Sequence, residues 1–317
     1  MEIVLNILKF AIGLGILILS SDFLIESSVR LASLFRLTPL FIGSILIGFG
    51  TSAPEAGIGI IAAFKDRTEI ALGNVIGSNI TNIGLVLGLC SFLRALDVER
   101  SFFKREFPFL LFSIFLLYFL SLDSVLGILD GIIFLGCLLI FLFFSYLRSK
   151  NEYKEKEDIE LKRFFKNLNS KWLVSLIFLF SLLGVIWGAN LMINSGVKLA
   201  KSFNINTWVI AVSAFAIGTS LPELATSLSA TFKRVHSISV GNIVGSNIFN
   251  ILFILGIASL ITPIKVELST LKFEFFWLFV FTLSLFLPQI THKKITRIQG
   301  LFLFLFYINF LVFLFFK

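Results

Sequence analysis

Two polar stretches decide the fold of this chain: GTSAPE at Gly50–Glu55 and GNVIGSNITN at Gly73–Asn82. Both recur 168 residues later without a gap, as GTSLPE at Gly218–Glu223 and GNIVGSNIFN at Gly241–Asn250. A shared apolar bias can match Leu to Ile by chance, but it does not match Thr, Ser, Pro, Glu, Asn and Gly in order. The chain therefore contains an internal repeat.

The composition around these motifs is that of a membrane protein. Of the 317 residues, 57% are hydrophobic and 15% are charged, and the mean hydropathy is +0.98. A soluble domain is about a quarter charged. The apolar residues form runs of about 20, the length that crosses a bilayer core. These features exclude a soluble enzyme, a nucleic-acid-binding protein and a disordered scaffold, and they predict an all-α integral membrane protein.

Hydropathy predicts ten transmembrane helices. We expect them over residues 3–34, 38–64, 68–92, 106–121, 125–147, 173–202, 206–232, 237–262, 273–290 and 297–316. The polar stretch 148–172 divides them five and five. This predicts a first five-helix repeat over residues 1–147 (motif region 50–88), a connector over 148–172, and a second repeat over 173–317 (motif region 218–256). An odd number of helices per repeat inverts the second repeat relative to the first.

The basic residues predict the orientation in the membrane. The side that holds the connector collects about 19 of the 27 Lys and Arg residues. We therefore expect a cytoplasmic connector and both termini outside. The N-terminal apolar stretch is interpreted as a retained first helix, because no small-residue cleavage site follows it. The cysteines, Cys90 and Cys137, both lie in apolar segments and indicate no disulfide framework.

Glu55 and Glu223 are carboxylates deep inside apolar segments, at matching positions of the two repeats. An intramembrane charge costs several kcal/mol and usually marks an ion or substrate path. A buried ion pair or a protonated Glu is the alternative. Because neither motif contains Lys or Arg, a bound cation is the expected counter-charge.

Pro54 and Pro222 directly precede these glutamates. A proline inside a helix removes one hydrogen bond, so we expect free carbonyls at Gly50 and Gly218. Free carbonyls at membrane depth occur where they line a cavity or bind a ligand. A plain proline kink, with hydroxyl groups capping the carbonyls, is the alternative.

The second motif predicts a polar stripe on the next helix, since its side chains recur at intervals of four. The stripe consists of Asn74, Ser78 and Asn82, and of Asn242, Ser246 and Asn250 in the second half. Interhelical amide bonding without a ligand is the alternative. The glycines at 73, 77, 241 and 245 predict close helix packing. Asn79 and Asn247 lie on another face and are expected to bond the facing broken helix.

All of these donors are oxygen atoms, which suit hard cations such as Ca²⁺, Na⁺, Mg²⁺ or Mn²⁺. A flexible, dehydrated site favours Ca²⁺ over Mg²⁺. Two glutamates carry two negative charges, which one Ca²⁺ or two Na⁺ would balance. Asp22 and Glu26 in the first helix match Asn190 and Asn194 in the sixth, and either a pathway role or a helix end explains them. Asp130 is expected to satisfy a helix end.

The two pairs of motifs resemble the paired α-repeats of the calcium/cation antiporter superfamily, most closely its prokaryotic sodium/calcium exchanger branch. The resemblance implies a secondary active antiporter that exchanges Na⁺ for Ca²⁺ by alternating access, with the first and sixth helices sliding against the rest. It also implies the cation ligands, namely Glu55, Glu223, Thr51, Thr219, Ser52, Ser220, Ser78, Ser246, Asn82 and Asn250.

Some positions depart from the family pattern. Several members carry Asp where this chain has Asn250, which argues against K⁺ cotransport. Ala53 stands where Leu is usual, and no acid follows soon after Gly73–Asn74, which argues against proton coupling. A Ca²⁺/H⁺ antiporter, another divalent cation exchanger, a passive channel and a non-transporting protein remain alternatives. We expect no enzyme activity, cofactor, nucleic acid or obligate protein partner, and a place in a prokaryotic cytoplasmic membrane.

Overall fold

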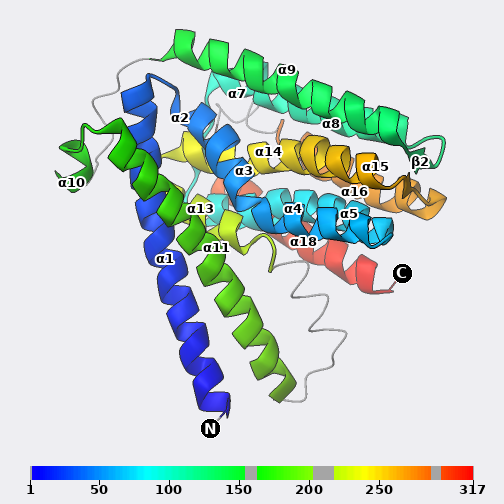
Figure 1. The fold of residues 1–317 in the computed structure, drawn as a ribbon, viewed down its shortest axis with the longest axis horizontal. Helices are drawn as coiled ribbons and strands as arrows, with labels where there is room; N and C mark the ends of the chain where they lie inside the picture. Colours follow the sequence, from blue (N-terminus) through cyan, green and yellow to red (C-terminus); the bar gives the residue numbers. More distant parts are fainter. Residues whose placement is uncertain (1, 154–162, 203–217, 287–293, 317) are drawn as a thin grey trace.

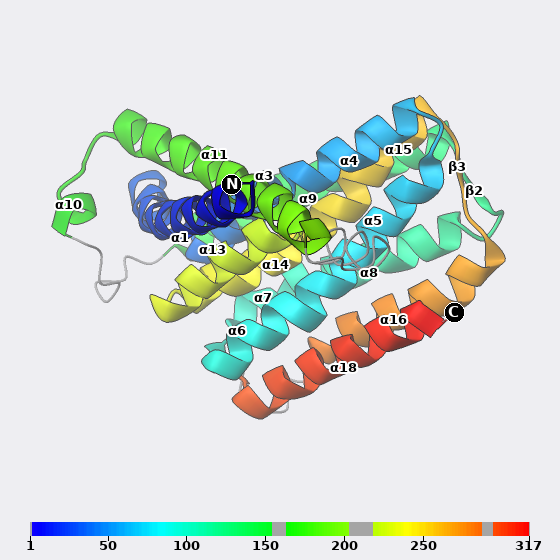
Figure 2. The same ribbon diagram turned by 90° about the horizontal axis from the view of Figure 1, so that it is seen from below.

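The computed structural model describes residues 2–153, 163–202, 218–286 and 294–316 (Figures 1 and 2). Two long helices, α1 (Glu2–Phe35) and α11 (Lys171–Ser202), lie side by side and run at a steep angle to most of the other helices. Their backbones touch, because a Cβ added to Gly188 would lie 2.7 Å from the Leu17 nitrogen. The two helices therefore form one closely packed pair.

The rest of the first half consists of a bent span, a long helical span and three further helices. The bent span contains α2 (Pro39–Phe41), the π-helix η1 (Ile42–Ile47), α3 (Gly48–Thr51) and α4 (Ala53–Phe64). Next come α5 (Thr68–Thr81), the π-helix η2 (Asn82–Leu87) and α6 (Gly88–Leu93). The half ends with α7 (Arg100–Lys104), α8 (Glu106–Leu120) and α9 (Ile128–Glu152).

The second half begins with α11, after the short helix α10 (Arg163–Lys166). Its described helices are α13 (Leu221–Phe232), α14 (His236–Phe249), the π-helix η3 (Asn250–Leu255), α15 (Gly256–Ile261), α16 (Leu268–Ser284) and α18 (Arg297–Phe316). Two short antiparallel strand pairs join the halves: β1 (Leu96–Asp97) with β4 (Lys294–Ile295), and β2 (Val125–Leu126) with β3 (Ile264–Lys265).

The motif-bearing helices lie at the centre of the molecule. Four-fifths of the most apolar window of α14–α15 is buried, compared with about a fifth for α1 or α18. The core between α5 and α14 includes Val75, Ile80, Ile243 and Ile248, all with no exposed surface. This arrangement sets the polar motifs between buried helices, and it leaves the outer helices with apolar surfaces that suit lipid.

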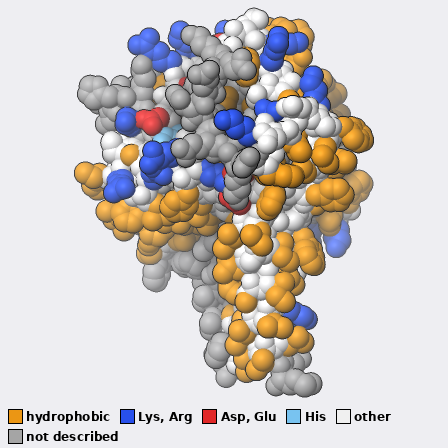
Figure 3. All heavy atoms as spheres, turned by 90° about the vertical axis from the view of Figure 1, so that its left-hand side faces the viewer, with side chains coloured by type: hydrophobic (Ala, Val, Ile, Leu, Met, Phe, Trp, Pro, Cys, Tyr) orange, Lys and Arg blue, Asp and Glu red, His pale blue; other side chains and the backbone are white. Residues whose placement is uncertain are grey.

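Six described helices are long and apolar enough to cross a membrane, or seven if the bent pair Pro39–Thr51 and Ala53–Phe64 is one span. Shorter described helices, α8, α13 and α16, occupy three further predicted ranges. On the face shown in Figure 3, Lys and Arg side chains gather over the upper half, and apolar side chains border them. The chain is thus a helical membrane protein, as the composition predicted.

Several smaller predictions can be compared with the structure. Asp130 satisfies a helix end as expected, since the Gly127 N–H donates to its carboxylate at 2.7 Å. The predicted connector contains the end of α9, α10 and the start of α11. Residues 154–162 of the connector, 206–217 of the predicted seventh helix and 287–290 of the predicted ninth lie outside the described residues. Close packing is confirmed for Gly241 and Gly245, whose added Cβ atoms would meet the backbone of the bent span.

Candidate cation-binding site

Both glutamates of the repeated motif lie in the first turn of a helix that follows a break. The first break is at Ser52 (φ −79°, ψ 8°), between α3 and α4, and the two parts of this span are bent by 47°. Ser220 (φ −87°, ψ 9°) precedes α13 in the same way. Pro54 and Pro222 lie at the first positions of the new helices, where a missing N–H costs nothing. Each proline therefore marks a helix start.

The prediction of a free carbonyl was wrong at Gly218. The Gly218 carbonyl accepts the Leu221 N–H at 3.3 Å. The Ser52 N–H is directed at the carbonyls of Gly48 and Gly50. A proline in a continuous helix would leave one acceptor free, whereas here the backbone turns at the break and supplies new donors.

The two carboxylates are buried in one region. Glu55 and Glu223 have no exposed surface, and they are close enough to interact electrostatically. Ser52 Oγ donates to Glu223 Oε1 at 3.1 Å, and Ser246 Oγ donates to the same oxygen at 3.4 Å. Because Ser52 belongs to the first break and Glu223 follows the second, this hydrogen bond joins the two breaks.

The hydroxyl groups of the motifs also meet across the two halves. Thr51 Oγ1 donates to Asn242 Oδ1 at 3.1 Å and lies 3.4 Å from Ser246 Oγ. Ser78 Oγ and Thr219 Oγ1 are 3.5 Å apart. The structure therefore brings the predicted Thr and Ser residues of both halves to the same place as the glutamates.

Four asparagines form a reciprocal arrangement where α5 crosses α14. Asn79 Nδ2 donates to the Asn247 carbonyl at 3.1 Å, and Asn247 Nδ2 donates to the Asn79 carbonyl at 3.1 Å. Asn82 Nδ2 donates to Asn247 Oδ1, and Asn250 Nδ2 donates to Asn79 Oδ1, both at 3.0 Å. The expectation that Asn79 and Asn247 bond the broken helices was wrong, because they bond each other's helix.

Several oxygens of the predicted ligand set have no hydrogen-bond partner in the described part of the chain. They are both Oε atoms of Glu55, Oε2 of Glu223, Oδ1 of Asn82 and Asn250, and Oγ of Ser220. The same residues form no ion pair there. A buried polar atom without a partner costs free energy, so such atoms indicate a ligand or ordered water.

The donor chemistry fits a hard cation. No group of three or more His, Cys, Asp or Glu side chains lies together among the described residues. The donors that do converge are two carboxylates with neutral hydroxyl and amide oxygens. Oxygen donors of this kind suit Ca²⁺ and Na⁺, whereas zinc and copper sites use imidazole or thiolate ligands.

Asn242 and Asn74 take a supporting role that the predicted polar stripe did not anticipate. Asn242 Nδ2 donates to Thr226 Oγ1 and Ser227 Oγ at 2.9 Å each, and it also lies 3.3 Å from the Glu223 carbonyl. Asn74 Nδ2 donates to the Glu55 carbonyl at 3.2 Å. These amides hold the glutamate-bearing helices. The polar run on α13, Ala225–Thr231, was the signal in the sequence for this contact.

A cavity of about 290 Å³ borders the site among the described residues. Asn190 and Asn194 of α11 line it together with Pro54, Thr219 and Pro222, which belong to the two breaks. Residues next to both glutamates therefore border a space that the sixth helix also lines. This supports a pathway role for the two asparagines.

The matching residues of the first helix, Asp22 and Glu26, form ion pairs and do not line this cavity. Asp22 Oδ1 lies 2.7 Å and Glu26 Oε1 2.6 Å from Lys233 Nζ, and the Glu26 side chain is 3% exposed. The acids of α1 are thus paired with a lysine in the turn between α13 and α14, whereas the asparagines of α11 are exposed at the cavity.

Comparison with known proteins identifies relatives over the whole chain. The family model described as "Sodium/calcium exchanger protein" matches residues 5–147 and 173–316. The sodium/calcium exchanger MaX1 of Methanosarcina acetivorans is 30% identical over 353 residues, covering 99% of each chain. The inner membrane protein YrbG of Escherichia coli is 32% identical over 81% of this chain and 80% of its own. A solved structure of the sodium-calcium exchanger NCX_Mj, soaked with Na⁺ and no Ca²⁺, superposes with a TM-score of 0.83 at 31% identity, covering 98% of this chain and 99% of that chain.

Proposed function

This chain belongs to the sodium/calcium exchanger protein family, and we propose from that membership that it exchanges Na⁺ for Ca²⁺ across a membrane as a secondary active antiporter. The family consists of exchangers, so no enzyme activity or cofactor is part of the proposal. One observation carries it: Glu55 and Glu223 are fully buried together, with carboxylate oxygens that lack partners in the described residues.

The charge of the site supports exchange between these two ions. Two carboxylates carry two negative charges, and either one Ca²⁺ or two Na⁺ neutralise them. Carrying both charges through the bilayer without a cation would cost several kcal/mol for each charge. The empty site therefore resists crossing, which couples the movement of one ion to the movement of the other.

We assign the cation ligands to the oxygens that converge on the two breaks. They are Glu55, Glu223, Thr51, Thr219, Ser52, Ser220, Ser78, Ser246, Asn82 and Asn250. The unpartnered oxygens of Glu55, Asn82, Asn250 and Ser220 support this assignment. Asn82 and Asn250 each begin a π-helical segment, a feature that is common at functional sites.

The proposed architecture is two inverted five-helix repeats, over residues 1–147 and 173–317, joined by a cytoplasmic connector over 148–172. The reciprocal bonds of Asn79 with Asn247, whose positions differ by 168 residues, support a two-fold relation between the repeats. The gathering of Lys and Arg on the face in Figure 3 supports placing the connector in the cytoplasm and both termini outside.

Sodium-driven uptake tests this function. Proteoliposomes loaded with Na⁺ and diluted into Na⁺-free buffer are expected to accumulate radioactive Ca²⁺ against its gradient, and liposomes without protein are the control. Accumulation driven by a pH gradient alone would instead assign Ca²⁺/H⁺ exchange. Flux that only runs down the Ca²⁺ gradient would assign a passive channel.

The hydroxyl of Ser52 is predicted to tune the affinity for Ca²⁺. In Ser52→Ala, Glu223 Oε1 loses its 3.1 Å hydrogen bond and the site loses one proposed oxygen ligand. We expect the Ca²⁺ concentration for half-maximal uptake to rise about tenfold, since a hydrogen bond to a charged group contributes about 1.5 kcal/mol or more. Ser91→Ala is the matched control, because that buried serine bonds only the carbonyls of its own helix. Equal half-maximal concentrations in both variants would exclude Ser52 from the site.

A further inference from the structure

The ion pairs between the first helix and the turn after α13 connect two parts of the molecule that the proposed function requires to move. Lys233 Nζ lies 2.7 Å from Asp22 Oδ1 and 2.6 Å from Glu26 Oε1. The Lys233 side chain is 21% exposed and that of Glu26 is 3% exposed. These contacts are partly shielded from water, so salt screens them less than it screens surface pairs.

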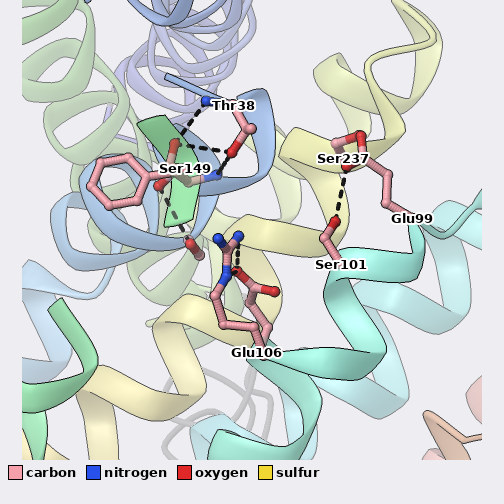
Figure 4. Close-up of polar contacts among 9 residues, drawn as sticks. Thr38, Glu99, Ser101, Glu106, Ser149 and Ser237 are labelled. Atoms are coloured by element: carbon pink, nitrogen blue, oxygen red, sulfur yellow. Dashed lines mark hydrogen bonds and ion pairs between the residues drawn. The ribbon is translucent and has the colours of Figure 1, made fainter. Parts of the chain in front are cut away.

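The turn that holds Lys233 is fixed to the body of the protein. Arg94 Nη1 donates to the Phe232 carbonyl at 3.2 Å. His236 Nδ1 lies 3.1 Å from Asp97 Oδ2, and Ser237 Oγ donates to Glu99 (Figure 4). Lys233 is thus anchored next to the segment between α6 and α7, and it reaches from there to α1.

The acids that it reaches belong to the α1–α11 pair. These two helices touch through their backbones at Gly13 and Gly188, where an added Cβ would lie within 3.0 Å of the neighbouring helix. Sliding one of these helices past the other would drive backbone into backbone, so we expect the pair to move as one unit. Any sliding of the pair against the body therefore changes the distances from Lys233 to Asp22 and Glu26.

The opposite end of the pathway has the matching lysine but lacks the acids. Lys65 lies 168 residues before Lys233, and Asn190 and Asn194 lie 168 residues after Asp22 and Glu26. Lys65 is exposed and forms no ion pair within the described residues. Asn190 and Asn194 line the cavity. Among the described residues, the ion pairs lie at the end with charged partners, and the cavity lies at the end with neutral partners.

We propose that Lys233, Asp22 and Glu26 form an ion-pair latch that holds the Lys233 end of the transport pathway closed and must break before that end opens. Sliding of the α1–α11 pair would bring Asn190 and Asn194 to Lys65. Because these are not acids, the state with the Lys233 end open gains no ion pair in exchange for the one it loses. The latch therefore favours the state with the cavity on the Asn190 side. This inference rests on the proposed alternating access, and it assigns the bias between the two states to three residues.

The state of Lys233 agrees with this role. Burial alone would lower the pKa of Lys233, but the hydrogen bonds and charges of Asp22 and Glu26 outweigh burial and raise this pKa above its ordinary value. Lys233 is therefore charged at neutral pH, as an ion pair with Asp22 and Glu26 requires.

The chain offers a matched pair of reporter positions. Val197 lines the cavity, and Val29, 168 residues earlier, is 5% exposed. In Val29→Cys, a charged, membrane-impermeant thiol reagent reacts only while the Lys233 end is open, so its rate reports the minor state. In Val197→Cys, the rate of the same reaction reports the state in which the cavity next to Asn190 is accessible. The parent chain, with Cys90 and Cys137, supplies the background rate.

The test removes the latch and then builds it at the other end. Asp22→Asn with Glu26→Asn gives the first half the side chains of the second, and Lys233→Met removes the cation. Each is expected to raise Val29→Cys labelling about tenfold without raising Val197→Cys labelling. Asn190→Asp with Asn194→Glu supplies acids opposite Lys65. This variant should also raise Val29→Cys labelling and slow Val197→Cys labelling, and Lys65→Met should reverse both effects.

The labelling is measured in Na⁺ without Ca²⁺, so that the site is occupied and both states are accessible. Because it measures conformation and not ion flux, it separates the latch from the exchange function. Unchanged Val29→Cys labelling in both latch-removal variants would overturn the latch, even where sodium-driven uptake is intact. Faster labelling at both reporter positions would also overturn it, because that result indicates general loosening. Labelling that responds as expected in a protein without sodium-driven uptake would support the latch and overturn the exchanger. If the latch-removal variants do not fold, the Asn190 and Asn194 variant decides alone.

Discussion

Glu223→Gln is expected to abolish sodium-driven Ca²⁺ uptake, with a loss of at least about 100-fold. Glu223 is fully buried, and its Oε1 accepts hydrogen bonds from Ser52 and Ser246, which belong to two different helices. Glutamine keeps the size of the side chain but removes one of two negative charges. A site with a single carboxylate leaves one charge of Ca²⁺ unbalanced in a low-dielectric region, which costs several kcal/mol.

The measurement is the initial rate of radioactive Ca²⁺ uptake by Na⁺-loaded proteoliposomes, with equal amounts of folded protein. Asp130→Asn is the matched control, since it makes the same acid-to-amide change in a residue that bonds a helix end at Gly127. The control is expected to retain uptake. Glu55→Gln should behave like Glu223→Gln. Uptake by Glu223→Gln within about threefold of wild type would exclude a site that needs both carboxylates.

Gly245→Ala is expected to prevent stable folding. A Cβ at Gly245 would lie 1.9 Å from the Ser44 carbonyl oxygen, far inside van der Waals contact. The obstacle is backbone of the π-helix η1, which cannot rotate away as a side chain can. The bent span would have to move off α14, next to the contacts of Thr51 with Asn242 and Ser246. Overpacking of this kind costs several kcal/mol.

The thermal unfolding midpoint of the purified protein in detergent measures this effect. Gly136→Ala in α9 is the matched control, because its added Cβ meets no described atom within 4 Å. Alanine there is expected to leave the midpoint unchanged or raise it, since glycine weakens a helix by about 0.5–1 kcal/mol. A midpoint for Gly245→Ala within about 2 °C of wild type would show that η1 and α14 do not pack as closely as described.

Much of the candidate site could be predicted from the sequence because the signals were local. Glu55 and Glu223 stood out as charges in apolar segments, and the repeat showed that the polar residues around them recur at matching positions. Hydropathy also predicted the helix ranges, since an apolar run of about 20 residues has few other folds. The matching positions of the motifs indicated that the two halves meet, but they did not predict which residues contact each other.

The remaining features depend on how helices cross, which periodicity does not encode. The sequence predicted prolines inside helices with free glycine carbonyls, but the helices break at Ser52 and Ser220, and at the second break the Leu221 N–H satisfies the Gly218 carbonyl. The π-helical segments that begin at Asn82 and Asn250 have no signal of their own in the sequence. Lys233 was one basic residue of a loop until the fold placed it against Asp22 and Glu26.

The most direct test of the central claim, that one buried site takes Ca²⁺ or Na⁺, is to locate the bound divalent cation. Crystals of the protein soaked with Sr²⁺ as a heavier substitute for Ca²⁺ would show it by anomalous scattering. We predict a peak within about 2.3–2.6 Å of carboxylate oxygens of both Glu55 and Glu223, as for Ca²⁺, and its loss when Na⁺ is added. A peak elsewhere, or a peak at this site that Na⁺ does not displace, would contradict the claim.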